Sequence, residues 1–159
     1  MTRDEKFQSV ARELGYSFDG EIKVGGNYTP LLRVGKDVYV SGQVPRVDST
    51  IVVTGRAGDD VDLDAARLAA KVCAMRALVL LQRALGGLEQ VEGIARVTVY
   101  VQSGADFTQQ SEVADAASDL LQFVLGPAGV HTRTSVGVFR LPKNATVEID
   151  MIAIAAVAA

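Results

Sequence analysis

The longest helical pattern in the sequence, from Asp64 to Leu85, is the feature that most constrains how this chain can fold. Strong helix formers fill the segment, acidic residues stand near its start where the helix dipole favours them, and Gly86-Gly87 ends it. Apolar residues cover much of its circumference. The exceptions are Arg67, Lys71, Arg76 and Arg83. A helix of this composition is expected to pack against a second layer of secondary structure.

The remaining patterns supply that layer. Val97, Val99 and Val101 alternate with polar residues, which predicts a half-buried strand over Ile94–Gln102. Apolar spacing predicts two more helices, one over Asp4–Leu14 and one that begins at a cap of Asp106 or Thr108 and ends at Gly126-Pro127. Further strands are predicted at Glu21–Val24, Tyr28–Val34, Asp37–Ser41, Ile51–Thr54, Arg133–Arg140 and Thr146–Ala155.

This order of elements predicts an α+β fold in which two long helices pack on one face of a mostly antiparallel sheet. The chain has 159 residues, the size of one ordinary domain, and shows no internal repeat or linker. We therefore expect a single domain over residues 1–159.

Charge and metal-ligand counts exclude several classes of function. Sixteen Lys and Arg against nineteen Asp and Glu give a net charge of −3, and the charges are dispersed along the chain. Nucleic-acid binding depends on clustered cations, so no nucleic-acid partner is expected. Cys73 and His131 are the single Cys and the single His. They can form neither a disulfide within the chain nor a four-ligand zinc site, so no structural metal is expected.

The sequence predicts a soluble, cytoplasmic protein. The first twelve residues carry charges in place of an apolar signal segment, and Lys71, Arg76 and Arg83 interrupt the most apolar stretch. No membrane partner is therefore expected. Apolar residues nevertheless make up 48% of the chain, which indicates apolar surface covered in an oligomer.

Common catalytic signatures are absent, including the nucleophile elbow, the Walker loop and the zinc-protease motif. Three segments instead combine small and polar residues at strand ends. They are Tyr28 with the Ser41–Pro45 turn (SGQVP), Val97–Phe107 (VTVYVQSGADF) and Arg133–Ala153 (RTSVGVFRLPKNATVEIDMIA). Together they resemble the RidA/YjgF family of reactive-intermediate deaminases, also called the L-PSP family. The resemblance runs over about Gly26–Ala155 and leaves residues 1–20 as an N-terminal helical extension of a divergent branch.

The resemblance implies a chorismate-mutase-like fold and a homotrimer with ligand clefts between subunits. It also implies hydrolysis of 2-imino acids, formed from enamines such as 2-aminoacrylate, to 2-keto acids and ammonia without a cofactor. Arg133 matches the family position that binds the substrate carboxylate, and a guanidinium does this with two parallel hydrogen bonds. Glu148 matches the family acid, which suits a general base or a group that positions water. Ser135, Ser41 and Tyr28 match substrate-binding positions.

A register estimate adds a prediction about the subunits. If the last two strands form a hairpin about Lys143, Glu148 lies opposite Val138, on the order of 16 Å from Arg133 at ~3.3 Å per residue. One chain could then hardly bring both side chains to a small substrate. We therefore predict that Arg133 and Glu148 of one site come from different subunits.

Other interpretations stay open at this stage. The protein could bind a small carboxylate metabolite without turnover, or it could be an endoribonuclease, a name attached to some family members. Arg133 could form a surface ion pair, Glu148 could face solvent, Tyr28 could be an ordinary strand aromatic and Ser41 a turn residue. His131, two residues before Arg133, could be a proton shuttle or a strand-entry residue. Cys73 is expected to be a packing residue.

Overall fold

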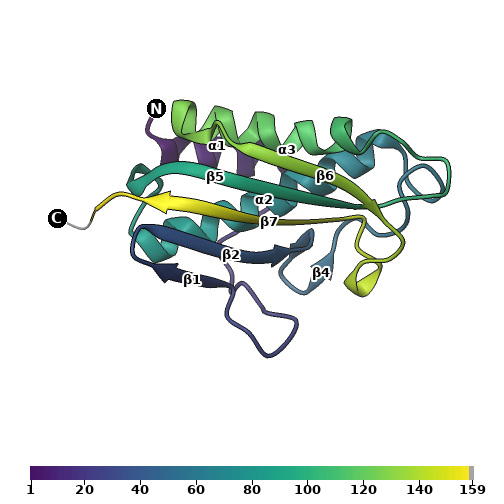
Figure 1. Ribbon diagram of the computed structural model, residues 1–159, viewed down its shortest axis with the longest axis horizontal. Helices are drawn as coiled ribbons and strands as arrows, with labels where there is room; N and C mark the ends of the chain where they lie inside the picture. Colours follow the sequence, from purple (N-terminus) through teal and green to yellow (C-terminus); the bar gives the residue numbers. More distant parts are fainter. Residues whose placement is uncertain (158–159) are drawn as a thin grey trace.

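The computed structural model describes residues 1–157 and has two layers, with helices packed on one face of a sheet (Figure 1). The helices are α1 (Arg3–Leu14), α2 (Leu63–Leu85) and α3 (Gln110–Leu125). The strands are β1 (Leu31–Val34), β2 (Asp37–Gln43), β3 (Arg46–Val47), β4 (Thr50–Ile51), β5 (Val91–Gln102), β6 (Thr132–Val138) and β7 (Val147–Ala155). Short 3-10 turns span Leu88–Gln90, Gly126–Gly129 and Pro142–Asn144.

The main sheet has the strand order β1-β2-β7-β5-β6, and β3 and β4 form a separate small ribbon. The pairs β1–β2, β2–β7 and β7–β5 are antiparallel, whereas β5 and β6 are parallel because α3 crosses over between them. The predicted α+β class is therefore confirmed, with a mostly antiparallel sheet and the two long helices on one face.

The predicted hairpin between the last two strands is wrong. β5 lies between β6 and β7, so Glu148 is paired with Tyr100 and Arg133 with Val97. β7 takes the central place because its alternate residues are buried beneath the helices, beginning with Val147 and Ile149. The register estimate that assumed a hairpin about Lys143 has no basis in this topology.

Four local predictions are also corrected. The run Glu21–Val24 forms no strand, and β1 begins only at Leu31, because Gly25-Gly26 and Pro30 interrupt extended pairing. Of the predicted strand Ile51–Thr54, only Ile51 lies in a strand, the two-residue β4, which pairs with β3. Neither Asp106 nor Thr108 caps α3. Its N-cap is Gln109, and Gln110 donates its side-chain amide to the Phe107 carbonyl at 2.9 Å.

The core lies between the sheet and the pair α2 and α3. Buried alanines on both helices allow them to pack closely against each other, with α2 also packed against β7 and α3 against β5 and β6. Cys73 of α2 is fully buried, and its thiol donates to the Val147 carbonyl at 3.5 Å. Burial raises the pKa of this thiol well above its ordinary value, which is the behaviour of a packing residue.

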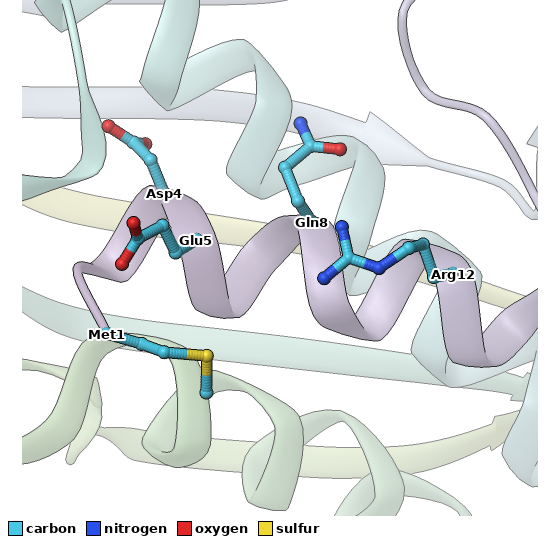
Figure 2. A pocket seen from close by; sticks show the side chains of 5 residues that line it. All are labelled: Met1, Asp4, Glu5, Gln8 and Arg12. Atoms are coloured by element: carbon cyan, nitrogen blue, oxygen red, sulfur yellow. The ribbon is translucent and has the colours of Figure 1, made fainter.

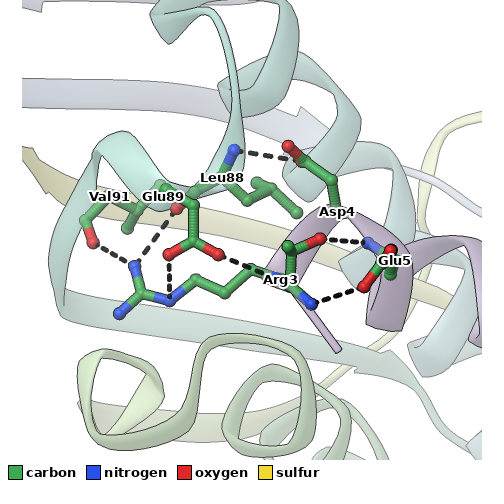
Figure 3. Close-up of polar contacts among 7 residues, drawn as sticks. Arg3, Asp4, Glu5, Leu88, Glu89 and Val91 are labelled. Atoms are coloured by element: carbon green, nitrogen blue, oxygen red, sulfur yellow. Dashed lines mark hydrogen bonds and ion pairs between the residues drawn. The ribbon is translucent and has the colours of Figure 1, made fainter.

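The N-terminal helix α1 is attached to the domain by specific contacts (Figure 3). Arg3 donates from Nη1 to the carbonyls of Leu88 and Val91, at 3.2 and 2.7 Å. Asp4 accepts from the Leu88 backbone N–H at 3.1 Å. Phe7 is fully buried and meets Phe18 edge to face, with ring centroids 6.1 Å apart. The extension is therefore part of the same packed unit.

Truncation of a core side chain tests this packing. Leu121→Ala on α3 is expected to lower the free energy of unfolding by about 2–5 kcal/mol, because it removes a fully buried side chain and leaves a cavity. Urea unfolding followed by circular dichroism measures the change. The matched control is Gln122→Ala, the next residue on α3, which is exposed and should change stability by less than about 0.5 kcal/mol. Equal losses for the two variants would contradict the assigned core.

Candidate functional site

A small cavity of about 210 Å³ lies where β2 ends beside β7. This volume is below the roughly 300–1,000 Å³ of sites for drug-sized ligands, so the cavity suits a small metabolite. Tyr28 and Glu148, two of the predicted site residues, both line it. The other lining residues are Lys23, Val24, Gly25, Pro30, Gly42, Gln43, Val44, Arg46, Arg76, Pro142 and Lys143.

Gly42 explains why the SGQ turn carries a glycine. The register of β2 against β7 shifts between Val40 and Gln43, so the chain bulges there. The Glu148 side chain lies across the bulge, and a Cβ atom on Gly42 would stand 2.3 Å from Glu148 Oε1. Any larger residue at position 42 would therefore have to displace the carboxylate from the cavity.

The Glu148 carboxyl group is half-buried, and its pKa is raised from the ordinary value. Burial is the main cause, and the nearby Asp150 carboxylate adds to the effect. Asp150 in turn accepts a hydrogen bond from the Tyr100 hydroxyl at 3.1 Å. A carboxylate with a raised pKa is a stronger base toward water, which agrees with the role predicted for Glu148.

Arg76 is the site residue that the sequence analysis missed. It was noted as a charged exception on α2, but its side chain is buried beneath the cavity with only 3% of its surface exposed. The residues one helical turn away, Val72 and Leu80, are also buried. Helical periodicity alone could therefore have placed Arg76 on the buried face.

The two serines predicted to bind substrate, Ser41 and Ser135, do not line the cavity directly. Ser41 donates from Oγ to the Thr29 carbonyl at 2.7 Å, which ties β2 to the loop that carries Tyr28. Ser41 is not among the residues that line the cavity. Ser135, on β6, has a buried Oγ without a hydrogen-bond partner among residues 1–157. Its backbone is paired with Val99.

Arg133 lies away from this cavity. Its Nη1 forms an ion pair with Asp115 Oδ1 at 2.8 Å and donates to Ser118 Oγ at 3.0 Å, both on α3. Arg133 is paired with the buried Val97, so its side chain lies on the helix-covered face of the sheet. Glu148 alternates with buried residues of β7 and lies on the open face. The two residues are therefore on opposite faces and separated by β5.

His131 belongs to the surroundings of Arg133. Its Nδ1 is 2.6 Å from the Gly129 carbonyl, and its Nε2 is 2.9 Å from Ser118 Oγ. Because a carbonyl only accepts, Nδ1 is the donor to Gly129. His131 does not line the Glu148 cavity.

A larger hollow of about 540 Å³ runs along α1, but nothing marks it as a reaction site. Figure 2 shows its lining side chains, Met1, Asp4, Glu5, Gln8 and Arg12, which all come from α1 and the residues before it. None of the predicted site residues is among them.

Residues 1–157 contain neither a metal-binding cluster nor a membrane-spanning helix. No group of three or more His, Cys, Asp or Glu side chains there is arranged to hold a metal ion. None of the helices in this part of the chain combines the length and the apolar character needed to cross a membrane.

Comparison with known proteins identifies the family. The family model described as Endoribonuclease L-PSP matches residues 19–155. The chain belongs to this family. The crystal structure of the YjgF gene product of E. coli matches 87% of this chain, and the match covers 95% of that chain, with a TM-score of 0.61 at 22% identity. The resemblance to the RidA/YjgF family and its fold is thus confirmed.

Three further proteins are similar to this chain. Protein TCP17 of Trypanosoma cruzi is 36% identical over 140 residues, 87% of this chain and 88% of TCP17. A 2-iminobutanoate/2-iminopropanoate deaminase of Dermatophagoides farinae is 28% identical over 130 residues, 81% of this chain and 86% of the deaminase. The crystal structure of Atu1372 from Agrobacterium tumefaciens, a protein of unknown function, has a TM-score of 0.86 at 36% identity. It covers 98% of this chain, so it includes α1, and the match spans 95% of Atu1372.

The raised pKa of Glu148 predicts a pH-dependent cost to stability. Below the ordinary carboxyl pKa, both the folded and the unfolded states are protonated. As the pH rises through that value toward the raised folded-state pKa, the unfolded state ionises first and the wild type loses stability. Glu148→Gln is therefore expected to be more stable than the wild type at neutral pH, by a margin that grows through this window and is constant above it.

Urea unfolding at a series of pH values measures this difference. Glu21→Gln, at an exposed loop residue, is the control and should show a much smaller pH-dependent difference. A Glu148→Gln variant that was no more stable than the wild type at neutral pH would show that the carboxylate is not desolvated in the folded protein.

Proposed function

We propose that the protein hydrolyses 2-imino acids to 2-keto acids and ammonia without a cofactor. The observation that carries this proposal is the half-buried Glu148 carboxylate, which lies over Gly42 in a cavity of metabolite size that Tyr28 also lines. The similarity to a 2-iminobutanoate/2-iminopropanoate deaminase supports the same reaction class.

The reaction needs a positioned water and two proton transfers. The water oxygen forms a bond to the imine carbon, and the electron pair of the C=N π bond moves to nitrogen. Glu148 takes a proton from the water and passes it to the nitrogen. Glu148 then carries the hydroxyl proton of this carbinolamine to the amino nitrogen, the C–N bond breaks with its electron pair leaving on ammonia, and an oxygen lone pair forms the keto C=O bond. Tyr28 lines the same cavity, and its proposed role is to order water or substrate through its hydroxyl.

The proposed role of Arg133 is in the site of a neighbouring subunit. Within one chain Arg133 and Glu148 face opposite sides of the sheet, so a small substrate could not contact both. β6 is an edge strand of the main sheet, so its residues are accessible to another subunit that packs against this edge. We propose that Arg133 of one subunit binds the carboxylate of a substrate whose imine carbon lies at Glu148 of another.

The open face of the sheet supports a homotrimer. Four large apolar side chains are exposed on it: Leu32, Val34, Tyr39 and Val136. Exposed apolar residues gathered on one sheet face are typical of a surface that another subunit covers. The proposed partner is a further copy of this chain.

In the second candidate function, the same cavity binds a small carboxylate metabolite without converting it. In both functions the carboxylate of the ligand has to displace Asp115 from Arg133, because these two side chains form an ion pair within the single chain. Ribonuclease activity is the least supported alternative, since the net charge is −3 and His131 lies outside the cavity. Salt-dependent RNA binding in a titration would be needed to support ribonuclease activity.

Two substitutions separate catalysis from binding. Arg133→Ala is expected to abolish both carboxylate binding and deamination, whereas Glu148→Ala should leave binding within a few-fold and lower turnover by about 10²–10⁴. Ammonia release from a freshly generated 2-imino acid measures turnover, and calorimetry with the keto acid measures binding. Full turnover by Glu148→Ala would eliminate it as the base.

Asp115→Ala is the matched control for Arg133→Ala. Both variants break the same exposed ion pair, which is worth no more than about 1 kcal/mol. Only Arg133→Ala removes the guanidinium, so Asp115→Ala should retain binding. Equal loss of binding in the two variants would show that the pair is merely structural.

The quaternary structure gives an independent prediction. Light scattering after gel filtration is expected to give three times the chain mass of 16.8 kDa. The double change Leu32→Glu with Tyr39→Glu places charges on the apolar open face and should yield folded monomers without turnover. A fully active monomer would contradict a site shared between subunits.

A further inference from the structure

The buried guanidinium of Arg76 is not matched by any acid in the structure. The side chain is 3% exposed, and no Asp or Glu among residues 1–157 forms an ion pair with it. Desolvation lowers the pKa of Arg76, which shows that its surroundings disfavour the charge. A buried charge is ordinarily paired, and a ligand can supply the missing partner.

The hydrogen bonds of Arg76 leave one edge of the guanidinium unused. Nε donates to Gln43 Oε1 at 3.1 Å, and Nη1 donates to the Arg46 carbonyl at 2.8 Å. Gln43 is itself held, because its amide nitrogen donates to the Ser41 carbonyl at 3.0 Å. Nη2 makes no hydrogen bond within residues 1–157, and Arg76 lines the cavity that contains Glu148. The guanidinium is thus oriented in advance with donors left for a ligand.

The remaining charges of the cavity also favour an anion. Arg46, Lys23 and Lys143 line it together with Arg76, and Glu148 is the one acid among its lining residues. None of these four cations has an ion-pair partner in the part of the chain that the structure describes. A substrate with a single carboxylate, already bound by Arg133 of a neighbour, would leave this group of cations uncompensated.

We propose that Arg76 binds a second carboxylate of the substrate, so that the site takes short dicarboxylic 2-imino acids and yields dicarboxylic 2-keto acids. This inference rests on the proposed function, in which Arg133 holds the first carboxylate and Glu148 lies at the imine carbon. A chain of about four to five carbons suits a cavity of about 210 Å³. A site built around a buried charge discriminates strongly against an analogue that lacks the complementary group.

Two stable keto acids of equal chain length test the proposal: 2-oxoglutarate, which has the second carboxylate, and 2-oxopentanoate, which lacks it. Calorimetry on the wild-type oligomer is expected to show at least tenfold tighter binding of 2-oxoglutarate. Arg76→Gln should reduce this ratio to near one, mainly through weaker binding of 2-oxoglutarate. A wild-type ratio near one, or a ratio that Arg76→Gln leaves unchanged, would overturn the proposal.

Arg76→Gln alters a buried side chain, so a loss of binding in that variant can also result from misfolding. A second variant, at a less buried residue, separates the two causes. Arg46→Gln changes a half-exposed cavity residue whose side chain makes no hydrogen bond within residues 1–157. It should lower the ratio several-fold with an unchanged circular dichroism spectrum. Exposed Arg12→Gln on α1 is the control and should keep the full ratio. If inorganic phosphate displaced 2-oxoglutarate at phosphate concentrations below the Kd of 2-oxoglutarate, the cations would be assigned to a phosphate group and the dicarboxylate would be rejected.

This test and the test of deamination can fail separately. Preference for 2-oxoglutarate without ammonia release would support the role of Arg76 and reject the deaminase. Turnover of imino acids with apolar side chains, without any preference for the dicarboxylate, would support the deaminase and reject the role of Arg76.

Discussion

The contact between the Glu148 carboxylate and the bare backbone of Gly42 is the constraint on which the site depends. It requires β2 to bulge before Gln43 and β7 to occupy the strand position next to it. These two conditions keep a carboxylate half-buried beside a cavity, and burial raises its pKa. A side chain at position 42 would remove that environment even if the rest of the sheet were unchanged.

The helix layer contributes a second charged group from the opposite direction. α2 is buried along most of its length, so any charge on its inner face must be satisfied locally or by a ligand. Arg76 is satisfied only in part, by the side chain of Gln43 and the backbone of Arg46. The cavity thus combines a carboxylate from the sheet with a guanidinium from the helix layer, and these two groups come from one chain.

Arg133 shows the limit of reasoning from a motif. Its position in the sequence matches the family pattern, but its contacts in a single chain are with Asp115 and Ser118 on α3. The expectation that it serves a neighbouring site first rested on a hairpin that does not form. It now rests on the opposite faces that Arg133 and Glu148 occupy, and it stays a prediction.

Local patterns were sufficient to predict the three helices, the long strand β5 and the α+β class, because periodicity and glycine stops act within a few residues of the chain. The same patterns, read with the family resemblance, selected Tyr28 and Glu148, which do line one cavity. The strand order, the place of β5 between β6 and β7, and the meeting of Arg76 and Glu148 at one cavity were decided only by the tertiary structure. Strand pairing and contacts between layers depend on which distant segments compete for the same sheet edge and the same core, and no local sequence window contains that information.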